Sequence, residues 1–115
     1  MQLNIAASIT EFEEAVVNFR QALYEAMTDV ENALSARVTL ATQAGLLQES
    51  LVSAIRAEEL YEVRYRAGAV PLRTWLDAQE QRREAEIAVA EIRLARYNNQ
   101  VLLYQALGGD TTQAS

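Results

Sequence analysis

The chain has 115 residues, a formal net charge of −6 and neither cysteine nor histidine, and all ten of its basic residues are arginine. Without cysteine and histidine it cannot form a thiol nucleophile, a Cys/His zinc site or a Ser-His-Asp triad. The acidic balance argues against nucleic-acid binding, because neutralising phosphates requires clustered cations. No apolar run reaches the roughly 18 to 20 residues that a membrane-spanning helix needs.

The rest of the composition favours long helices. Half of the residues are hydrophobic but only 7% are aromatic, and the chain has four glycines and one proline. Ala, Leu, Glu, Gln and Arg dominate, which is typical of long helices and coiled coils. We therefore predict an all-α fold in a single domain, 1–115, built as a long antiparallel helical hairpin, mainly a coiled coil.

The first arm of the hairpin is predicted over residues 9–66. Thr10, with Glu13 and Glu14 after it, has the pattern of a helix N-cap followed by acids in the first turn. Apolar residues then recur every three or four positions, which keeps them on one helix face. This stripe comprises Phe12, Val16, Phe19, Leu23, Met27, Val30, Leu34, Val38, Ala41, Ala44, Leu47, Leu51 and Ile55.

A short tip, 67–71, and a second arm, 72–107, follow, with a tail at 108–115. Pro71 suits the start of a helix, where its missing N–H costs nothing, and Gly108 suits a helix stop. The second arm's apolar stripe comprises Leu72, Trp75, Ala78, Ala85, Ile92, Ala95, Leu102 and Ala106.

The two arms differ in length. At about 1.5 Å per residue the first arm reaches roughly 85 Å and the second roughly 50 Å. Either the N-terminal residues overhang, or a kink near Thr39–Gly45 makes them a separate, offset helix. The sequence leaves both alternatives open.

The second stripe has a polar gap from Asp77 to Glu86, in which only two alanines are apolar. One interpretation is a solvated helix face with an attractive i,i+4 pair between Arg82 and Glu86. The other is that this face lines an aqueous passage.

Parts of the sequence resemble the outer-membrane efflux protein family (TolC-like outer-membrane factors). Residues 64–79 are similar to its second periplasmic hairpin tip, with Arg-Tyr-x-x-Gly followed after a short stretch by Leu-Asp-Ala-Gln. Residues 103–109 are similar to its helix terminus near the mature C-terminus. Residues 19–23 and 29–34 are similar to its helix after the second pair of membrane strands.

The resemblance implies a particular architecture. Family members are trimers that share one β-barrel in the outer membrane and a long α-helical tunnel in the periplasm. The chain would form about the last quarter of such a protein, as a periplasmic fragment that does not itself span the membrane. Its exposed seams would pack against neighbouring hairpins of the parent trimer, or self-associate when the fragment is isolated.

In the family, the hairpin tip contacts a periplasmic adaptor (membrane-fusion) protein, which bridges to an inner-membrane pump. Glycine permits positive φ at the reversal, and small residues let another backbone approach closely. A plain turn glycine is the alternative interpretation of Gly68. The expected adaptor-contact residues are Arg66, Ala67, Gly68, Ala69, Val70, Leu72 and Arg73.

The resemblance also implies residues that line or close the tunnel, namely Tyr65, Thr74 and Asp77. Asp77 matches an acid that points into the tunnel near its closed periplasmic end, and Tyr65 matches a tyrosine of the closing hydrogen-bond network. Two positions depart from the family: Val70 and Thr74 stand where a basic residue and a second acid are sometimes found. We therefore expect closure that is less ionic and more apolar.

We predict a passive channel wall in the Gram-negative periplasm, not an enzyme, with no cofactor, no metal and no nucleic-acid partner. The alternative is a generic coiled-coil interaction module that is unrelated to export. The small-Gly-small tip separates the two, because a scaffold does not need one.

Overall fold

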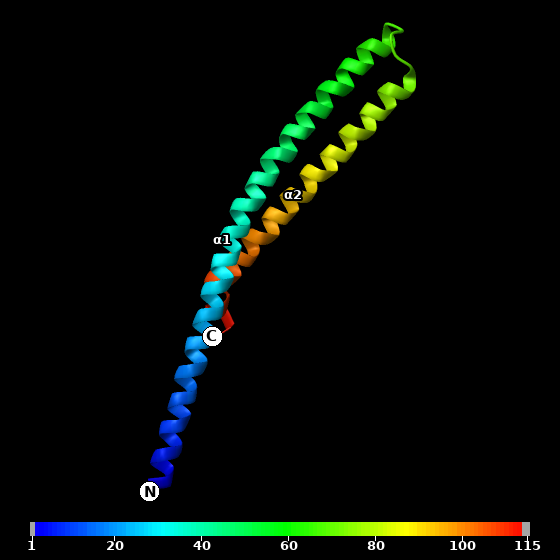
Figure 1. Cartoon of the computed structure of the whole chain (residues 1–115). Coiled ribbons are helices and arrows are strands. Elements are labelled where there is room, and N and C mark those ends of the chain that lie inside the picture. The colour runs from blue at the N-terminus through cyan, green and yellow to red at the C-terminus, as the bar shows by residue number, and fades with distance from the viewer. Residues whose placement is uncertain (1, 114–115) are drawn as a thin grey trace. The chain divides into compact units, whose positions relative to one another are not determined.

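The structure, a computed structural model, describes residues 2–113. Helix α1 runs from Gln2 to Arg66 and helix α2 from Leu72 to Gln113, and the described residues contain no β-strand. The two helices run antiparallel on either side of a short turn (Figure 1). The predicted all-α antiparallel hairpin is therefore confirmed.

Helix α1 is longer than the predicted first arm. It begins at Gln2, so Thr10 is not an N-cap; its hydroxyl donates a hydrogen bond of 2.9 Å to the carbonyl of Ala6 within the helix. This back-bonding satisfies the hydroxyl without ending the helix. The helix is also unbroken through Thr39–Gly45, so no separate N-terminal helix forms.

Helix α2 also passes the end that the sequence predicted. It continues through Gly108 to Gln113, so the stop expected at Gly108 is wrong. Glycine lowers helix propensity by about 1 kcal/mol relative to alanine but does not by itself end a helix. Among the described residues, Gly68 is the glycine that ends a helix by adopting a positive φ.

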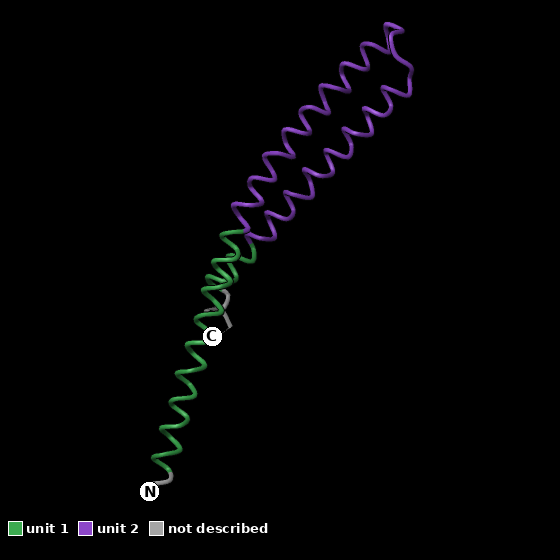
Figure 2. Tube along the Cα trace, viewed as in Figure 1, with its two compact units in different colours: residues 1–35, 101–115 green, residues 36–100 purple. Residues whose placement is uncertain are grey.

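The chain divides into two compact units, coloured in Figure 2. Unit 2, residues 36–100, contains the turn and the two helix segments that flank it. Unit 1 comprises residues 1–35 and 101–115 and contains the start of α1 and the end of α2. Few residues are buried in either unit, because a pair of helices can bury only a narrow seam.

The seam of unit 2 follows a heptad pattern with steps of three and four residues. Along α1 its half-buried positions are Leu40, Ala44, Leu47, Leu51, Ala54, Glu58, Tyr61 and Tyr65. Along α2 its buried and half-buried positions are Trp75, Ala78, Arg82, Ala85, Val89, Ile92, Ala95 and Asn99. Val89 is absent from the predicted stripe, whereas Leu72, which the stripe includes, is 44% exposed.

Unit 1 buries Ala33 of α1 and Leu103 of α2. Their neighbours Leu34 and Leu102 were predicted to face the seam but are exposed. The predicted stripes thus identified the helices but drifted in places by one residue from the buried face. Towards its start, α1 carries large apolar side chains that are exposed: Ile5, Ile9, Phe12, Phe19 and Leu23.

Candidate functional site: the hairpin apex

The apex, residues 67–71, reverses the chain between the two helices. Gly68 has φ +77°, a left-handed conformation that residues with a Cβ rarely adopt. The amide of Ala69 donates to the carbonyl of Arg64 at 2.8 Å, and that of Gly68 donates to the carbonyl of Tyr65 at 2.9 Å. This pair of bonds is a Schellman motif, which satisfies carbonyl groups left open at a helix C-terminus. The glycine therefore ends α1 and turns the chain.

Helix α2 starts directly after Pro71. The amide of Thr74 donates to the carbonyl of Pro71 at 3.1 Å, which closes the first turn. Proline has no N–H to lose, and its fixed φ is already helical. A glycine that ends one helix and a proline that begins the next thus keep the apex short.

The side chains of the apex are largely uncovered. Val70 is half-buried, and a Cβ at Gly68 would meet no atom of the described chain within 4 Å. Within this chain, glycine is therefore required by its backbone conformation and not by crowding, and the space in front of it is open. The other predicted contact residues are all exposed: Arg66, Ala67, Gly68, Ala69, Leu72 and Arg73.

Arginines surround the apex. Arg64 and Arg66 lie in the last turn of α1, where the helix dipole favours a cation. Arg66 forms an exposed ion pair with Glu62 at 3.0 Å, and the guanidinium of Arg64 lies 5.9 Å from the centre of the Tyr61 ring. Arg73 is exposed in the first turn of α2. The apex therefore combines small residues with cationic flanks.

Below the turn, Tyr65 of α1 stacks on Trp75 of α2. Their ring centres are 5.5 Å apart and the ring planes are inclined by 30°. Both side chains are half-buried, and the indole Nε1 is buried without a hydrogen-bond partner. The stacked pair joins the two helices next to the reversal, so Trp75 acts as a packing anchor.

The residues predicted to line or close a tunnel lie in different surroundings. Tyr65 is engaged by Trp75, and Thr74 is half-buried, whereas Asp77 is exposed on α2. Their grouping in a gate stays a prediction.

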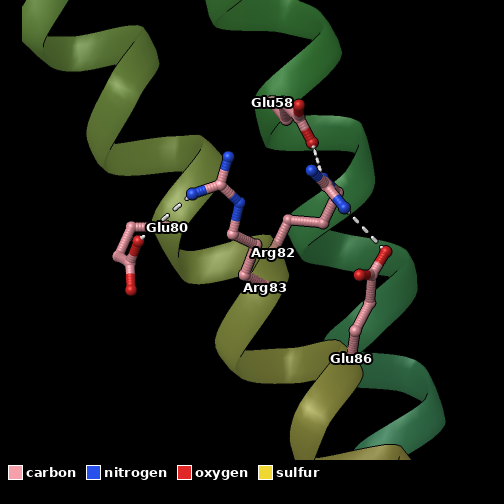
Figure 3. A network of polar contacts seen from close by, with 5 residues as sticks. All are labelled: Glu58, Glu80, Arg82, Arg83 and Glu86. Atoms are coloured by element: carbon pink, nitrogen blue, oxygen red, sulfur yellow. Dashed lines mark hydrogen bonds and ion pairs between the residues drawn. The ribbon is translucent and has the colours of Figure 1, made fainter.

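A second contact between the helices lies in the polar gap of α2 (Figure 3). Arg82 forms an ion pair through its Nε with Glu58 of α1, and its guanidinium contacts Glu86 of α2 at 2.7 Å. The hydrogen bond to Glu86 is the main cause that raises the pKa of Arg82; partial burial opposes it, and Glu58 adds to the rise. The guanidinium therefore stays charged over the whole pH range in which proteins are folded.

The predicted pair between Arg82 and Glu86 is thus confirmed, but the bridge to Glu58 was missed. The sequence contained a signal for it, since Arg82 stands four residues after Ala78 and three before Ala85, at a seam position of the heptad. The gap is not simply a solvated face, because one of its charges points into the seam.

The described residues contain no group of three or more His, Cys, Asp or Glu side chains that could hold a metal ion. Within residues 2–113, neither helix has a stretch long and apolar enough to cross a membrane.

These features define a long helical hairpin whose apex turns at a glycine and is exposed. A family model described as outer membrane efflux protein matches residues 1–109. The chain belongs to the outer membrane efflux protein family. The predicted resemblance is therefore confirmed.

Curated relatives agree with this assignment. The chain is 38% identical over 102 residues to the pyoverdine export outer membrane protein OpmQ of Pseudomonas aeruginosa, which covers 89% of this chain and 22% of the relative. It is 36% identical over 99 residues to OpmQ of Pseudomonas putida, covering 86% of this chain and 21% of the relative. It is 30% identical over 112 residues to the cation efflux system protein CusC of Escherichia coli O157:H7. That match covers 97% of this chain and 24% of the relative.

The chain thus spans less than a quarter of the length of these relatives. No solved structure matches it significantly.

Proposed function

We propose that this hairpin forms part of the wall of the periplasmic tunnel of a trimeric outer-membrane efflux channel. Its apex docks onto a periplasmic adaptor of a tripartite pump, and an inner-membrane pump supplies the energy. Membership of the efflux family supports an export role over a generic coiled-coil module. The hairpin has no catalytic task in this proposal; it encloses a passage and carries a contact surface.

The open space at Gly68 is the observation that carries the docking proposal. A turn that served only to connect two helices could carry side chains around its glycine, but residues 67–69 are Ala-Gly-Ala and all exposed. Small residues let the backbone of a second helical hairpin approach closely. The flanking Arg66 and Arg73 can then donate to carboxylates or carbonyl groups of that partner.

The cargo is not selected at this hairpin. The names of the two kinds of relative refer to pyoverdine export and to cation efflux, which are chemically unlike cargoes, although both proteins match nearly the whole of this chain. A wall of exposed helix surface without a metal-binding group among the described residues fits a shared conduit. In this proposal, selection belongs to the pump that feeds the channel.

The docking proposal is tested by adding bulk at the apex of the full-length channel. Gly68→Trp is expected to abolish binding of the adaptor and efflux of the pump's substrate, while helicity measured by circular dichroism stays unchanged. Adaptor binding is measured with the purified channel and its cognate adaptor, and efflux by substrate accumulation in cells.

Two further variants separate bulk from backbone strain. Ala67→Trp adds the same side chain at an exposed position that does not need a positive φ, and it should also block docking. Gly68→Asn keeps the side chain short, and asparagine tolerates the left-handed conformation better than other residues do, so docking should survive. Normal efflux with both tryptophan variants would refute the docking proposal.

A further inference from the structure

The hairpin seam changes character between Trp75 and Val89 of α2. In this interval its seam positions are occupied by Ala78, Arg82 and Ala85, so no large apolar side chain contributes. Alanines bury little surface, so little apolar packing is lost when the helix rotates. Apolar packing therefore holds α2 only loosely to one rotational setting in this interval.

Arg82 supplies what the alanines lack. Its side chain is only 25% exposed and that of Glu58 only 19%, although both carry charges. The guanidinium joins Glu58 of α1 to Glu86 of α2, as Figure 3 shows. The aliphatic stem of an arginine can fill a seam while its charged end reaches a partner. Arg82 is thus the charged side chain of α2 that crosses to α1 in the described contacts.

Rotating α2 by one residue would break this arrangement. In the direction that brings Glu84 to the place of Ala85, Gln81 would take the place of Arg82, and Gln81 is exposed in the structure and carries no charge. Glu58 would keep its half-buried place and lose its cation, and a carboxylate that loses its partner out of full contact with water is costly. This rotated setting is therefore penalised by charge.

We propose that Arg82 is a positioning residue, which fixes the rotational setting of α2 against α1 in the tip-proximal half of the hairpin. A single polar residue in a coiled-coil seam can specify one arrangement at a cost in stability. Here the consequence is that the residues of α2 between the apex and Val89, Asp77 among them, keep one direction. The inference concerns the hairpin itself and does not rest on the export role.

The proposal can be tested by disulfide trapping, because the chain has no cysteine of its own. Ala54 lies four residues before Glu58 and Ala85 three after Arg82, and both are half-buried, so Ala54→Cys with Ala85→Cys reports the observed setting. Ala54→Cys with Glu84→Cys reports a rotated setting, since Glu84 is exposed. Disulfides form only between closely placed Cβ atoms, so the ratio of the two oxidation rates measures the setting.

The substitution to compare is Arg82→Leu, which keeps bulk in the seam and removes the charge. We expect the ratio of the 54–85 to the 54–84 oxidation rate to fall by about tenfold, the effect of losing one hydrogen bond to a charged group, while helicity and Tm stay the same or rise. Glu58→Gln, which removes the partner on α1, should lower the ratio in the same direction. Arg82→Lys should lower the ratio of oxidation rates less than Arg82→Leu does.

Arg83→Leu is the matched control, because it removes the neighbouring arginine whose contact stays within α2. Its rate ratio should equal that of the starting protein. An unchanged ratio with Arg82→Leu would overturn the proposal, and so would equal losses with Arg82→Leu and Arg83→Leu. Oxidation is followed in dilute solution as the monomeric product on non-reducing gels, with mass spectrometry to locate the bond.

Discussion

The two halves of the hairpin in unit 2 are built differently. Away from the apex, α2 contributes Val89 and Ile92, which are 6% and 9% exposed and are the large apolar residues buried in that unit. Nearer the apex, between the stacked Trp75 and Val89, its seam contains Ala78, Ala85 and the bridging Arg82. The comparison indicates that one half supplies most of the cohesion and the other supplies specificity.

This division follows from how much surface each side chain can bury. Burying a valine or isoleucine contributes about 1.5 to 3 kcal/mol, whereas an alanine has little side chain to remove from water. A half-buried ion pair contributes less to net stability, because bringing charges out of water offsets their attraction. The interval between the Tyr65–Trp75 stack and Val89 is thus the less strongly held part of unit 2.

The largest expected effect comes from the cohesive half. Ile92→Ala should lower the free energy of unfolding by about 2 to 4 kcal/mol, because it removes buried methyl groups and leaves a void in a seam with few other apolar contacts. Thermal or urea unfolding followed by circular dichroism measures the loss.

Ile87→Ala is the matched control for this substitution. The same side chain is removed from the same helix, but Ile87 is 57% exposed. We expect a change of less than about 0.5 kcal/mol in the isolated chain, as for other surface positions. Equal losses for the two variants would contradict the view that the observed seam is the source of cohesion.

The next effect compares two exposed glycines. Gly68→Ala should destabilise the hairpin by about 1 to 2 kcal/mol, because alanine is strained at the left-handed φ of +77°. Gly45→Ala should stabilise it by about 0.5 to 1 kcal/mol, because Gly45 lies within α1, where alanine is the better helix former. Neither new Cβ would meet another atom within 4 Å, so crowding does not enter the comparison. Urea unfolding midpoints should therefore shift in opposite directions.

Much of this hairpin was accessible from the sequence. The scarcity of turn residues before Ala67 predicted a long first arm but left a kink near Thr39–Gly45 open, and Gly68 with Pro71 located the reversal. The helix ends were harder to predict, because Thr10 can cap a helix or bond back into one, and Gly108 can end a helix or continue it.

The buried face was harder to predict than the helices themselves. Steps of three and four residues fit several neighbouring stripes on a helix, and only the partner helix decides which one is buried. Arg82 illustrates the difficulty, since an arginine in a polar stretch is expected to be solvated until Glu58 is placed beside it. The stacking of Tyr65 on Trp75 likewise depends on the distance between helices and not on either sequence position alone.

The smallest expected change in stability is at Asp77, which is exposed in the half of the hairpin nearer the apex. Asp77→Ala should change the free energy of unfolding by less than about 0.5 kcal/mol. If three copies of the hairpin surround a tunnel, as we propose, three Asp77 carboxylates form an anionic ring that attracts cations. The same variant in the full-length channel should therefore reduce cation preference, measured as the reversal potential across a planar bilayer under a salt gradient.

Glu59→Ala is the matched control for the effect of Asp77→Ala on cation preference. Glu59 is an exposed acid nine residues before Gly68, and Asp77 is an exposed acid nine residues after it, so the two differ chiefly in the helix that carries them. If α2 lines the tunnel, the Asp77 variant alters selectivity more than the Glu59 variant does. An unchanged reversal potential for Asp77→Ala would contradict the proposed anionic ring. It would not affect the docking role proposed for Gly68, because the apex can bind a partner whichever helix faces the passage.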